Sequence, residues 1–369
     1  MSVPVLTFFN NKGGVGKTSL VYHLSWMFSD LGLRVLAVDL DPQANLSSAF
    51  LTEDDFESLF ERHNGSPPAT IHEALRPLIE GYGDVQPPEL YHASDAFQEA
   101  QSQLPMADVQ SPELYRAGET LWLIPGDLLL STFEDQLSET WPKCSNGDIR
   151  AFRVTSAFWR VMQMAAAQIN AGLILVDVGP NLGAINRAAL IASDHVVIPL
   201  APDLFSLQGL RNLGPRLRSW RQDWQEKLNK FSGGNFTLPP AHTKPVGYIV
   251  QQHAVRLDRP VKAYARWMDR IPGQYRESVL KSPPAPGVRV DNDPHCLAML
   301  KNYRSLMPLA QEARKPMFHL KTADGAMGSH ATAALEVYAD YKKLAMRIAS
   351  RANIILPPPN DQPQAPPRS

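Results

Sequence analysis

The chain has 369 residues, of which 44% are hydrophobic, and its 36 basic and 37 acidic side chains leave a net charge of −1. This length suits one large or two small α/β domains, and the balanced charge excludes a global field that would attract nucleic acid or membrane. Two distant cysteines, Cys144 and Cys296, disfavour a disulfide framework, a zinc site and a cysteine-ligated iron–sulfur cluster, and no apolar stretch approaches 18 residues. We expect a cytoplasmic globular protein without a membrane span or secretory leader.

A strand, a loop, a helix and a second strand are predicted at the start of the chain. Residues 3–9 form a short apolar run, residues 18–31 carry apolar side chains at helical spacing, and Gly32 ends that helix. Residues 35–38 are a second buried strand. This is a βαβ unit, which predicts a parallel sheet.

Later apolar runs continue the alternation of strands and helices. They span residues 173–176, 195–198 and 246–250, and the segments between them are long enough for helices. The predicted fold class is therefore α/β, with a doubly wound, mostly parallel sheet flanked by helices.

Interruptions of this pattern suggest how the chain is organised. Residues 61–119 are rich in Pro, Gln, Glu and Ala and are predicted to be an insertion with short helices, while residues 233–244 and 282–294 are predicted surface loops. Residues 357–369 are mostly Pro and polar residues, and we expect this tail to be disordered. Residues 1–356 are interpreted as a single domain.

Residues 11–18 read Asn-Lys-Gly-Gly-Val-Gly-Lys-Thr and lie between the first strand and the first helix. A glycine-rich loop in this place presents backbone N–H groups at the positive end of a helix dipole, which suits phosphate oxygens. In a P-loop of this kind Lys17 bridges the β- and γ-phosphates and the Thr18 hydroxyl ligates Mg²⁺. We expect ATP and Mg²⁺ as cofactors, with nucleotide contacts from Asn11, Lys12, Gly13, Gly14, Val15, Gly16, Lys17, Thr18 and Ser19. The alternative is a glycine-rich turn that binds nothing.

The second lysine of the loop, Lys12, is a departure from an ordinary P-loop. With it the sequence resembles the deviant Walker ATPases of the ParA/MinD superfamily, and within them the ParA/Soj chromosome and plasmid partition ATPases. The resemblance implies that Lys12 contacts the nucleotide of a partner subunit in an ATP-sandwich homodimer, because it has little to do within its own subunit. The alternative is a solvated loop lysine.

Two carboxylates, Asp39 and Asp41, follow the second strand at the edge where α/β sites assemble. Placing them together is costly unless a positive group such as Mg²⁺ or a loop lysine lies nearby. The resemblance gives Asp41 the catalytic role of orienting the hydrolytic water, beside Lys12 and Lys17, and puts Asp39 close to the metal. Alternatively, both carboxylates cap the next helix.

The run at residues 173–176 ends in Asp177, as a Walker B strand does. Asp177 is expected to hold Mg²⁺ through a water, which makes the expected metal set Thr18, Asp39 and Asp177. Gly179-Pro180-Asn181 would form the switch that senses the γ-phosphate. Val178-Gly179 departs from the family, which more often has two prolines here.

Adenine contacts are expected in a late loop. The segment that begins at Lys301 and Asn302 is similar to the family's adenine-side loop, although the family has proline and arginine where Leu300 and Lys301 stand. Gln251 and Gln252 could also face the base, and hydrogen bonding at the end of a strand is an equal alternative.

Two basic clusters are candidates for binding DNA without sequence specificity, as the resemblance implies. A last helix over residues 331–352 places Lys343, Arg347 and Arg351 on one stripe, opposite an apolar one. A second cluster contains Arg211, Arg216, Arg218 and Arg221. The alternative for either cluster is a solvated helix face.

The three motifs, in family order, imply a ParA-like ATP hydrolase for partition or cargo positioning. Hydrolysis would be slow and stimulated by a ParB-like partner, and the ATP-bound dimer would associate with the nucleoid. The alternative function is an ATP-gated protein-interaction module of a regulatory or defence complex, without DNA transport; the insertion favours this reading. Membrane recruitment of the MinD kind is not expected, because the chain ends in a proline-rich tail.

Overall fold

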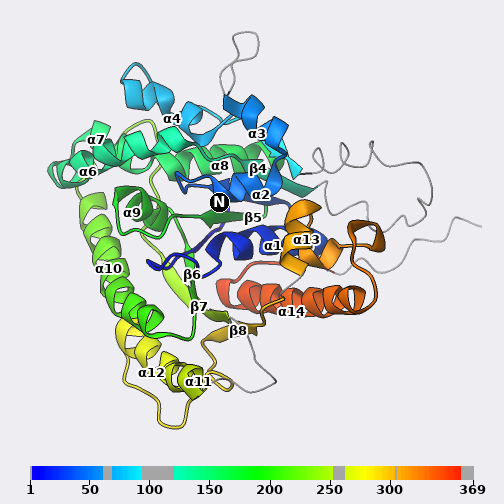
Figure 1. Cartoon of the computed structure of the whole chain (residues 1–369). Helices are drawn as coiled ribbons and strands as arrows, with labels where there is room; N and C mark the ends of the chain where they lie inside the picture. Colours follow the sequence, from blue (N-terminus) through cyan, green and yellow to red (C-terminus); the bar gives the residue numbers. More distant parts are fainter. Residues whose placement is uncertain (1, 61–68, 94–119, 252–261, 304–305, 359–369) are drawn as a thin grey trace, which may run out of the picture.

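The computed structural model describes residues 2–60, 69–93, 120–251, 262–303 and 306–358. Its centre is an eight-stranded sheet with the order β3-β4-β2-β5-β1-β6-β7-β8 (Figure 1). Every neighbouring pair is parallel except β3 and β4, which are antiparallel. The strands are β1 (Val5–Phe8), β2 (Val35–Asp39), β3 (Tyr91–His92), β4 (Leu121–Ile124), β5 (Leu173–Asp177), β6 (His195–Leu200), β7 (Lys244–Gln251) and β8 (Cys296–Leu300).

Helices cover both faces of this sheet, so the predicted doubly wound, mostly parallel α/β fold is confirmed (Figure 1). They are α1 (Lys17–Asp30), α2 (Asn45–Phe50), α3 (Glu53–Phe60), α4 (Ile71–Glu80), α6 (Phe133–Lys143), α7 (Ile149–Thr155), α8 (Ala157–Ile169), α9 (Ala184–Ile191), α10 (Leu204–Leu228), α11 (Lys262–Met268), α12 (Ile271–Tyr275), α13 (Leu306–Glu312) and α14 (Ser329–Ala352).

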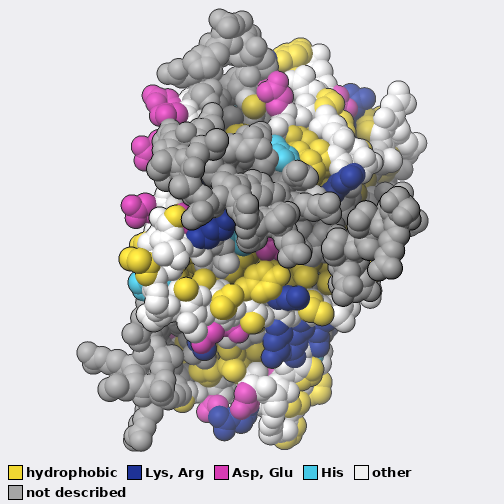
Figure 2. Space-filling view, turned by 90° about the vertical axis from the view of Figure 1, so that its right-hand side faces the viewer, with side chains coloured by type: hydrophobic (Ala, Val, Ile, Leu, Met, Phe, Trp, Pro, Cys, Tyr) yellow, Lys and Arg dark blue, Asp and Glu magenta, His cyan; other side chains and the backbone are white. Residues whose placement is uncertain are grey.

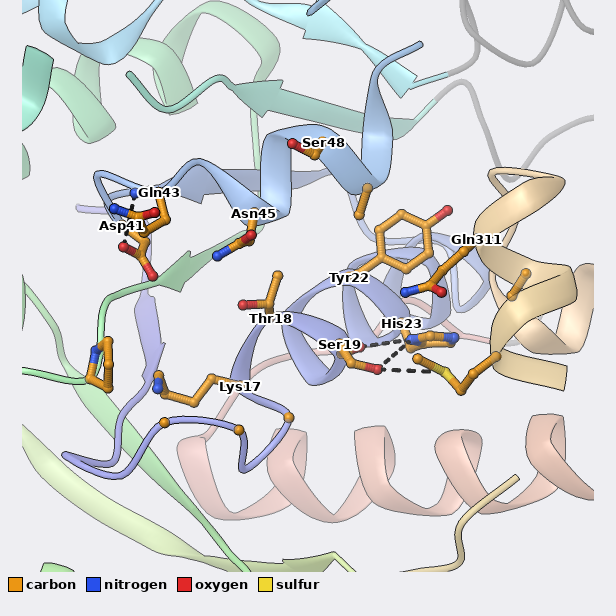
Figure 3. A pocket seen from close by; sticks show the side chains of 17 residues that line it. Lys17, Thr18, Ser19, Tyr22, His23, Asp41, Gln43, Asn45, Ser48 and Gln311 are labelled. Atoms are coloured by element: carbon orange, nitrogen blue, oxygen red, sulfur yellow. Dashed lines mark hydrogen bonds between the residues drawn. The ribbon is translucent and has the colours of Figure 1, made fainter. Parts of the chain in front are cut away.

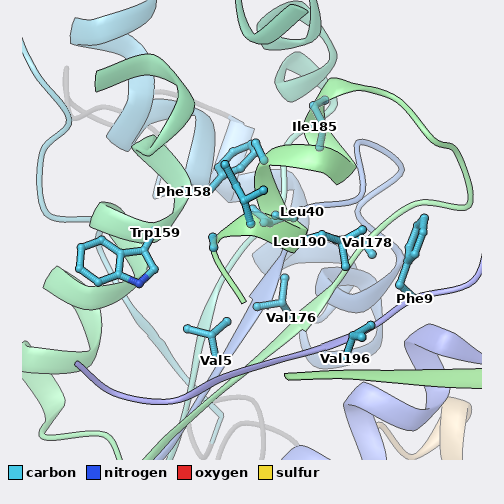
Figure 4. Close-up of a cluster of buried hydrophobic side chains, with 14 of the residues drawn as sticks. Val5, Phe9, Leu40, Phe158, Trp159, Val176, Val178, Ile185, Leu190 and Val196 are labelled. Atoms are coloured by element: carbon cyan, nitrogen blue, oxygen red, sulfur yellow. The ribbon is translucent and has the colours of Figure 1, made fainter. Parts of the chain in front are cut away.

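Successive residues of the central strands enter two different hydrophobic cores. In β1, Val5 packs into one core and Leu6 into the other; in β5, Leu175 and Val176 divide in the same way. This follows from the two-residue period of a strand, and strands buried on both faces are continuously apolar. The first core lies under α8 and α9 (Figure 4), and the second lies under α1 and α14.

The structure confirms the predicted βαβ unit and the strands at residues 173–176, 195–198 and 246–250. Strands β4 and β8 were not predicted. Of the predicted insertion at 61–119, the described part contains α4 and the short edge strand β3, and residues 61–68 and 94–119 lie outside the described residues. The single-domain boundary therefore stays a prediction.

The end of α14 leads into a segment that returns to the first βαβ unit. A Cβ added at Gly32 would lie 3.0 Å from Cγ of Pro357, so Pro357 packs on the turn between α1 and β2. The rest of the predicted tail, residues 359–369, lies outside the described residues. Among the helices that are described, none combines the length and apolar character needed to cross a bilayer.

Candidate nucleotide-binding site

The P-loop connects β1 to α1 at the carboxyl edge of the sheet. Gly14 and Gly16 both have φ of +72°, a left-handed conformation that favours glycine, and Gly16 directly precedes the first residue of α1. An added Cβ at Gly16 would lie 2.5 Å from Nε2 of Gln251, so a side chain there would have to displace the end of the Gln251 side chain. The loop therefore leads directly into the first turn of α1, whose backbone N–H groups have no acceptor within the helix.

Asn10, which sequence reasoning did not single out, anchors this loop. Its side-chain Nδ2 donates to the carbonyl of Pro199 at 2.7 Å, and its Oδ1 accepts from the backbone N–H of Lys12 at 3.0 Å. Gly209 of α10 packs against the Asn10 and Asn11 side chains: a Cβ added at Gly209 would lie 2.9 Å from Oδ1 of each of them. The loop is thus fixed between β6 and α10.

Lys12 has a partner within its own chain. Its ammonium forms an ion pair with Asp203, whose side chain also caps α10 by accepting from Ser206 N at 2.8 Å. The Lys12 ammonium lies 6.0 Å from the centre of the Phe205 ring, within cation–π range. The expectation that Lys12 has little to do within its own subunit is therefore wrong, because α10 supplies a carboxylate at that point. Its contact across a dimer stays a prediction.

Three carboxylates and one ammonium meet beyond the loop. Asp39 and Asp177 end the adjacent strands β2 and β5 and pair in register, and Asp41 follows two residues after Asp39. The Thr18 hydroxyl donates to Oδ2 of Asp177 at 2.6 Å. Lys17 and all three carboxylates are buried. The structure therefore brings the predicted metal residues together with Lys17 and Asp41, whereas the third predicted catalytic residue, Lys12, lies apart from them beside Asp203.

Burial shifts the protonation equilibria of this cluster. Desolvation, and then the charge of Asp39, raises the pKa of Asp177 to about 8. Desolvation also raises the pKa of Asp39 to about 6, against hydrogen bonds from Ser47 that lower it. The pKa of Lys17 is lowered by burial, and the charges of Asp177 and Asp41 oppose that shift. A bound cation would relieve the repulsion between these carboxylates.

The donor set at this edge fits Mg²⁺ bound together with phosphates. Oδ1 of Asp177 is buried without a hydrogen-bond partner, and Thr18 lies beside the same carboxylate. In the described part of the chain no group of three or more His, Cys, Asp or Glu side chains could hold a metal by itself. Mg²⁺ is usually held by one or two carboxylates together with substrate phosphates and water. The pair formed by Asp177 and Thr18 agrees with this coordination.

Asp39 also supports the loop that follows β2. Its Oδ2 accepts from both the N–H and the hydroxyl of Ser47, at 2.9 and 2.8 Å, and its Oδ1 accepts from Asp41 N at 3.2 Å. Ser47 lies in the first turn of α2, so the alternative role of helix capping is met in part by Asp39. Asp41 accepts only from Gln43 N among the described contacts, at 3.1 Å.

A cavity of about 700 Å³ opens beside the P-loop (Figure 3). Its inner half is lined by the loop, the start of α1 and Asp41, and its outer half lies between α1, α2 and α13. Tyr22, His23, Met307 and Gln311 line the outer half. Tyr22, His23 and Met307 were not singled out in the sequence, because contacts between α1 and α13 depend on tertiary packing. Gln311 lies further along the segment that begins at Lys301 and Asn302 and resembles the family's adenine-side loop, although no contact with the base was predicted for it.

The predicted adenine residues lie apart from that lining. Lys301 and Asn302 are exposed, and Lys301 forms an ion pair with Glu336 at 3.7 Å. Gln251, at the end of β7, donates from Nε2 to the carbonyl of Gly16 at 3.3 Å and so supports the P-loop just before α1 begins. Gln252 lies outside the described residues.

Most of the predicted DNA-binding residues also bond within the chain. Arg347 donates to Leu297 O and Arg351 to Pro294 O, while Lys343 is exposed. In the second cluster Arg216 is exposed. The other three donate hydrogen bonds within the chain: Arg211 to Gln274, Arg218 to the carbonyl of Ser278, and Arg221 to the carbonyl of Thr243. On the face shown in Figure 2, Lys and Arg side chains form small separate groups among hydrophobic and acidic ones.

A doubly wound sheet with a P-loop after β1 and buried aspartates ending β2 and β5 is typical of P-loop nucleotide-binding proteins. The second loop lysine, Lys12, is typical of their deviant Walker type. The family described as AAA domain matches residues 3–230, which is more than half of the chain. The chain belongs to this family. Its sequence is also similar to those of ParA/Soj-type partition proteins.

Curated relatives include the sporulation initiation inhibitor protein Soj of Bacillus subtilis, which is 26% identical over 57% of this chain. The chromosome partitioning protein ParA of Myxococcus xanthus is 28% identical over 57% of this chain. The matches span 62% and 56% of those two proteins, so each relative extends well beyond its match.

Solved structures share the fold. A Corynebacterium diphtheriae protein superimposes with a TM-score of 0.61 at 20% identity, covering 95% of this chain and 98% of its own. A Cyanothece McdA variant in complex with ATP gives a TM-score of 0.55 at 18% identity, covering 96% and 98%. The similarity of fold to these solved structures therefore extends beyond residue 230, where the family match ends, and includes the part of the sheet that contains β7 and β8.

Proposed function

We propose that this chain is an ATPase that binds MgATP in the cavity beside the P-loop and hydrolyses it slowly. The observation that carries the proposal is the meeting of Lys17, Thr18 and Asp177 with Asp41 at the inner end of a cavity of about 700 Å³. A nucleoside triphosphate fits such a space, since small-molecule sites enclose about 300–1,000 Å³.

Each inner residue has a chemical task in that proposal. Backbone N–H groups of the loop and the Lys17 ammonium bind the phosphate oxygens, and Thr18 and Asp177 would hold Mg²⁺. The metal, when bound, supplies positive charge that neutralises the phosphates as the γ-phosphoryl group departs. Asp41, with one described hydrogen bond, retains acceptor capacity to orient the attacking water.

The base would occupy the outer half of the cavity. Tyr22 and Met307 offer apolar walls there, and the Gln311 amide offers both a donor and an acceptor for the edge of a base. Lys301 and Asn302 stay candidates for outer contacts that form when nucleotide binds. Adenine is the base that the family membership favours.

Dimerisation and DNA binding complete the proposal. In the ATP-bound state Lys12 leaves Asp203 and contacts the nucleotide of a second copy, which makes the dimer dependent on ATP. The dimer binds DNA without sequence specificity, chiefly through Lys343 and Arg216, which are the exposed residues without a described partner in each cluster. A ParB-like protein stimulates hydrolysis, and the ATP-bound dimer associates with the cytoplasmic nucleoid. The names of the relatives support partition as the process served.

Two substitutions test the nucleotide site. Lys17→Ala removes the ammonium that faces the phosphates and should abolish binding of a fluorescent ATP analogue. Asp41→Ala should bind the analogue as the wild type does and lose steady-state phosphate release. Equal hydrolysis by Asp41→Ala and the wild type would contradict the role of Asp41, and tight binding by Lys17→Ala would contradict the site.

A further inference from the structure

The loop after β5, Gly179-Pro180-Asn181, lies between the nucleotide cavity and α9. A Cβ added at Gly179 would lie 3.2 Å from Oδ1 of Asp41, and one added at Gly13 would lie 4.0 Å from Pro180. The loop thus contacts both the P-loop and the carboxylate proposed to orient water. A displacement of the loop would therefore move Asp41 or expose it to bulk water.

Asn186, in α9, ties the loop to that helix from behind. It is 1% exposed, and its Nδ2 lies within hydrogen-bond distance of Gly179 O at 2.8 Å, Asn181 O at 2.7 Å and Asn181 Oδ1 at 2.9 Å. The two amide protons are shared among three acceptors, so only a side chain that donates at this point suits the site. Asn186 therefore fixes both ends of the loop to α9.

Glu134, at the start of α6, fixes α9 in turn. Its Oε1 accepts from Ala184 N at 2.5 Å, and its Oε2 accepts from Ile185 N at 2.8 Å. These are N–H groups of the first turn of α9, which have no acceptor within the helix, and a carboxylate there also interacts favourably with the helix dipole. Gly183 leaves room for the Glu134 carboxylate, since an added Cβ at Gly183 would clash with Oε1 of Glu134.

A second contact holds the far side of the same helix pair. Arg187 of α9 donates to the carbonyl of Leu137 in α6 at 3.1 Å, and its guanidinium lies 4.5 Å from the centre of the Trp141 ring. With Glu134 at one end and Arg187 at the other, α6 and α9 are joined as one unit. The position of α6 is thereby transmitted to the loop.

We propose that Glu134 and Asn186 are positioning residues that hold the Gly179–Asn181 loop against Asp41 and so set the rate of ATP hydrolysis without setting the affinity for nucleotide. This inference rests on the proposed ATPase function. The cavity lining includes Pro180 but neither Glu134 nor Asn186. Because these two residues do not line the cavity, replacing them should change the rate of hydrolysis and leave the affinity for nucleotide nearly unchanged.

The test compares Glu134→Ala, Glu134→Gln and Asn186→Ala with the wild type, and uses Glu139→Ala, an exposed glutamate of α6, as a matched control. We expect kcat to fall about tenfold to a hundredfold in the two alanine variants, as for a reacting group displaced by about 1 Å, while KM for ATP changes less than about twofold. Glu134→Gln retains one acceptor oxygen and should recover part of kcat. Glu139→Ala should behave as the wild type.

Hydrogen exchange provides a second readout that needs no ATP turnover. In the nucleotide-free protein the amides of Ala184 and Ile185 should exchange faster in Glu134→Ala than in Glu139→Ala. Unchanged kcat with unchanged exchange would overturn the inference, and so would a parallel loss of ATP affinity and kcat. A wild-type protein that neither binds nor hydrolyses ATP would instead overturn the proposed function, while the exchange data would still decide whether Glu134 holds α9.

Discussion

Asp39, Asp41, Asp177 and Lys17 form a buried cluster with more negative than positive charge. Such a cluster is costly without a cation, which is why burial and mutual repulsion raise the pKa of Asp177 to about 8. Binding of a metal ion would lower this cost, and in the proposed function the nucleotide would supply the remaining ligands.

MgATP should stabilise the folded chain through this cluster. At a concentration one hundred times its Kd, a ligand that binds only the folded state adds about 3 kcal/mol to the free energy of unfolding. We expect Tm to rise more with ATP and Mg²⁺ than with ATP and EDTA, and Asp177→Asn should abolish the difference. An Asp177→Asn protein with the full Mg²⁺ response in differential scanning fluorimetry would contradict this metal site.

His23 gives the chain a dependence of stability on pH. Its Nε2 accepts from Met317 N at 3.2 Å, so Nδ1 carries the proton and donates to Ser19 O at 2.7 Å. Burial then lowers the pKa of His23 to about 4. Because the unfolded chain binds a proton at His23 below about pH 6.5 and the folded chain does not, the contribution of His23 to stability falls as pH drops from 6.5 toward 4. The raised pKa values of Asp39 and Asp177 act in the opposite direction, so the effect of His23 is isolated by comparing the wild type with a His23 variant.

The expected loss from His23 is about 3 kcal/mol over the whole range from pH 6.5 to pH 4, and about 2 kcal/mol of it falls between pH 7 and pH 5. Denaturant titrations of the wild type and His23→Gln at pH 7 and pH 5 measure this part. The wild type should lose about 2 kcal/mol more stability than His23→Gln on going from pH 7 to pH 5. An equal difference in the two proteins would mean that His23 does not titrate as its burial requires.

Helix α10 connects the P-loop to the far end of the sheet. It approaches the loop closely at Gly209, and its N-cap is Asp203, the partner of Lys12. Gly209→Leu should push α10 away from Asn10 and Asn11 and weaken binding of the fluorescent ATP analogue about tenfold or more, as expected when phosphate contacts are misplaced. Gly273→Ala is the control, since an added Cβ there meets nothing within 4 Å. Equal affinity in both variants would mean that α10 does not hold the loop.

The elements that sequence reasoning predicted are those with a clear local pattern. Strands β1, β2, β5, β6 and β7 are apolar runs between turn signals, so their period and burial could be predicted. Strand β4 has four residues and follows a segment rich in Pro, Gln and Glu, and β8 follows a proline-rich loop, so neither stood out. Their place in the sheet depends on long-range pairing with β2 and β7.

In the candidate site, too, residues within a local sequence motif could be predicted, and residues placed by tertiary packing could not. The P-loop, Asp39, Asp41 and Asp177 are marked by spacing within short motifs, and the structure brings them together. Glu134 carries no such mark, because it meets its partner 50 residues away. Gln311 lies in the late segment that resembles the family, but its place in the cavity depends on the packing of α13 beside α1 and could not be predicted from the sequence. Tertiary packing also gave Lys12 a partner, Asp203, that no local pattern predicts.

At the scale of the whole molecule, a net charge of −1 means that any DNA binding by this chain would have to come from a local surface. Several predicted basic residues bond to backbone carbonyls, which leaves Lys343 and Arg216 as the best candidates. With ATP, affinity for random duplex DNA should fall between 50 and 200 mM salt, and Lys343→Glu or Arg216→Glu should reduce the salt slope by about 1 to 2.

Fluorescence anisotropy with labelled DNA measures this slope, and ADP serves as the control state. Absence of ATP-dependent binding even at low salt would favour the alternative function, an ATP-gated module that binds protein and not DNA. The described part of the predicted insertion, α4 and β3, would then be the first surface to search for that partner.

The central claim is that ATP joins two copies of this chain through Lys12. Sedimentation velocity of the Asp41→Ala protein, which should retain ATP, measures this directly in MgATP and in MgADP. We predict a dimer in MgATP, a monomer in MgADP, and a monomer in both when Lys12→Ala is added. An equally populated dimer in MgATP with and without Lys12→Ala, or no dimer despite saturating ATP binding, would contradict the claim.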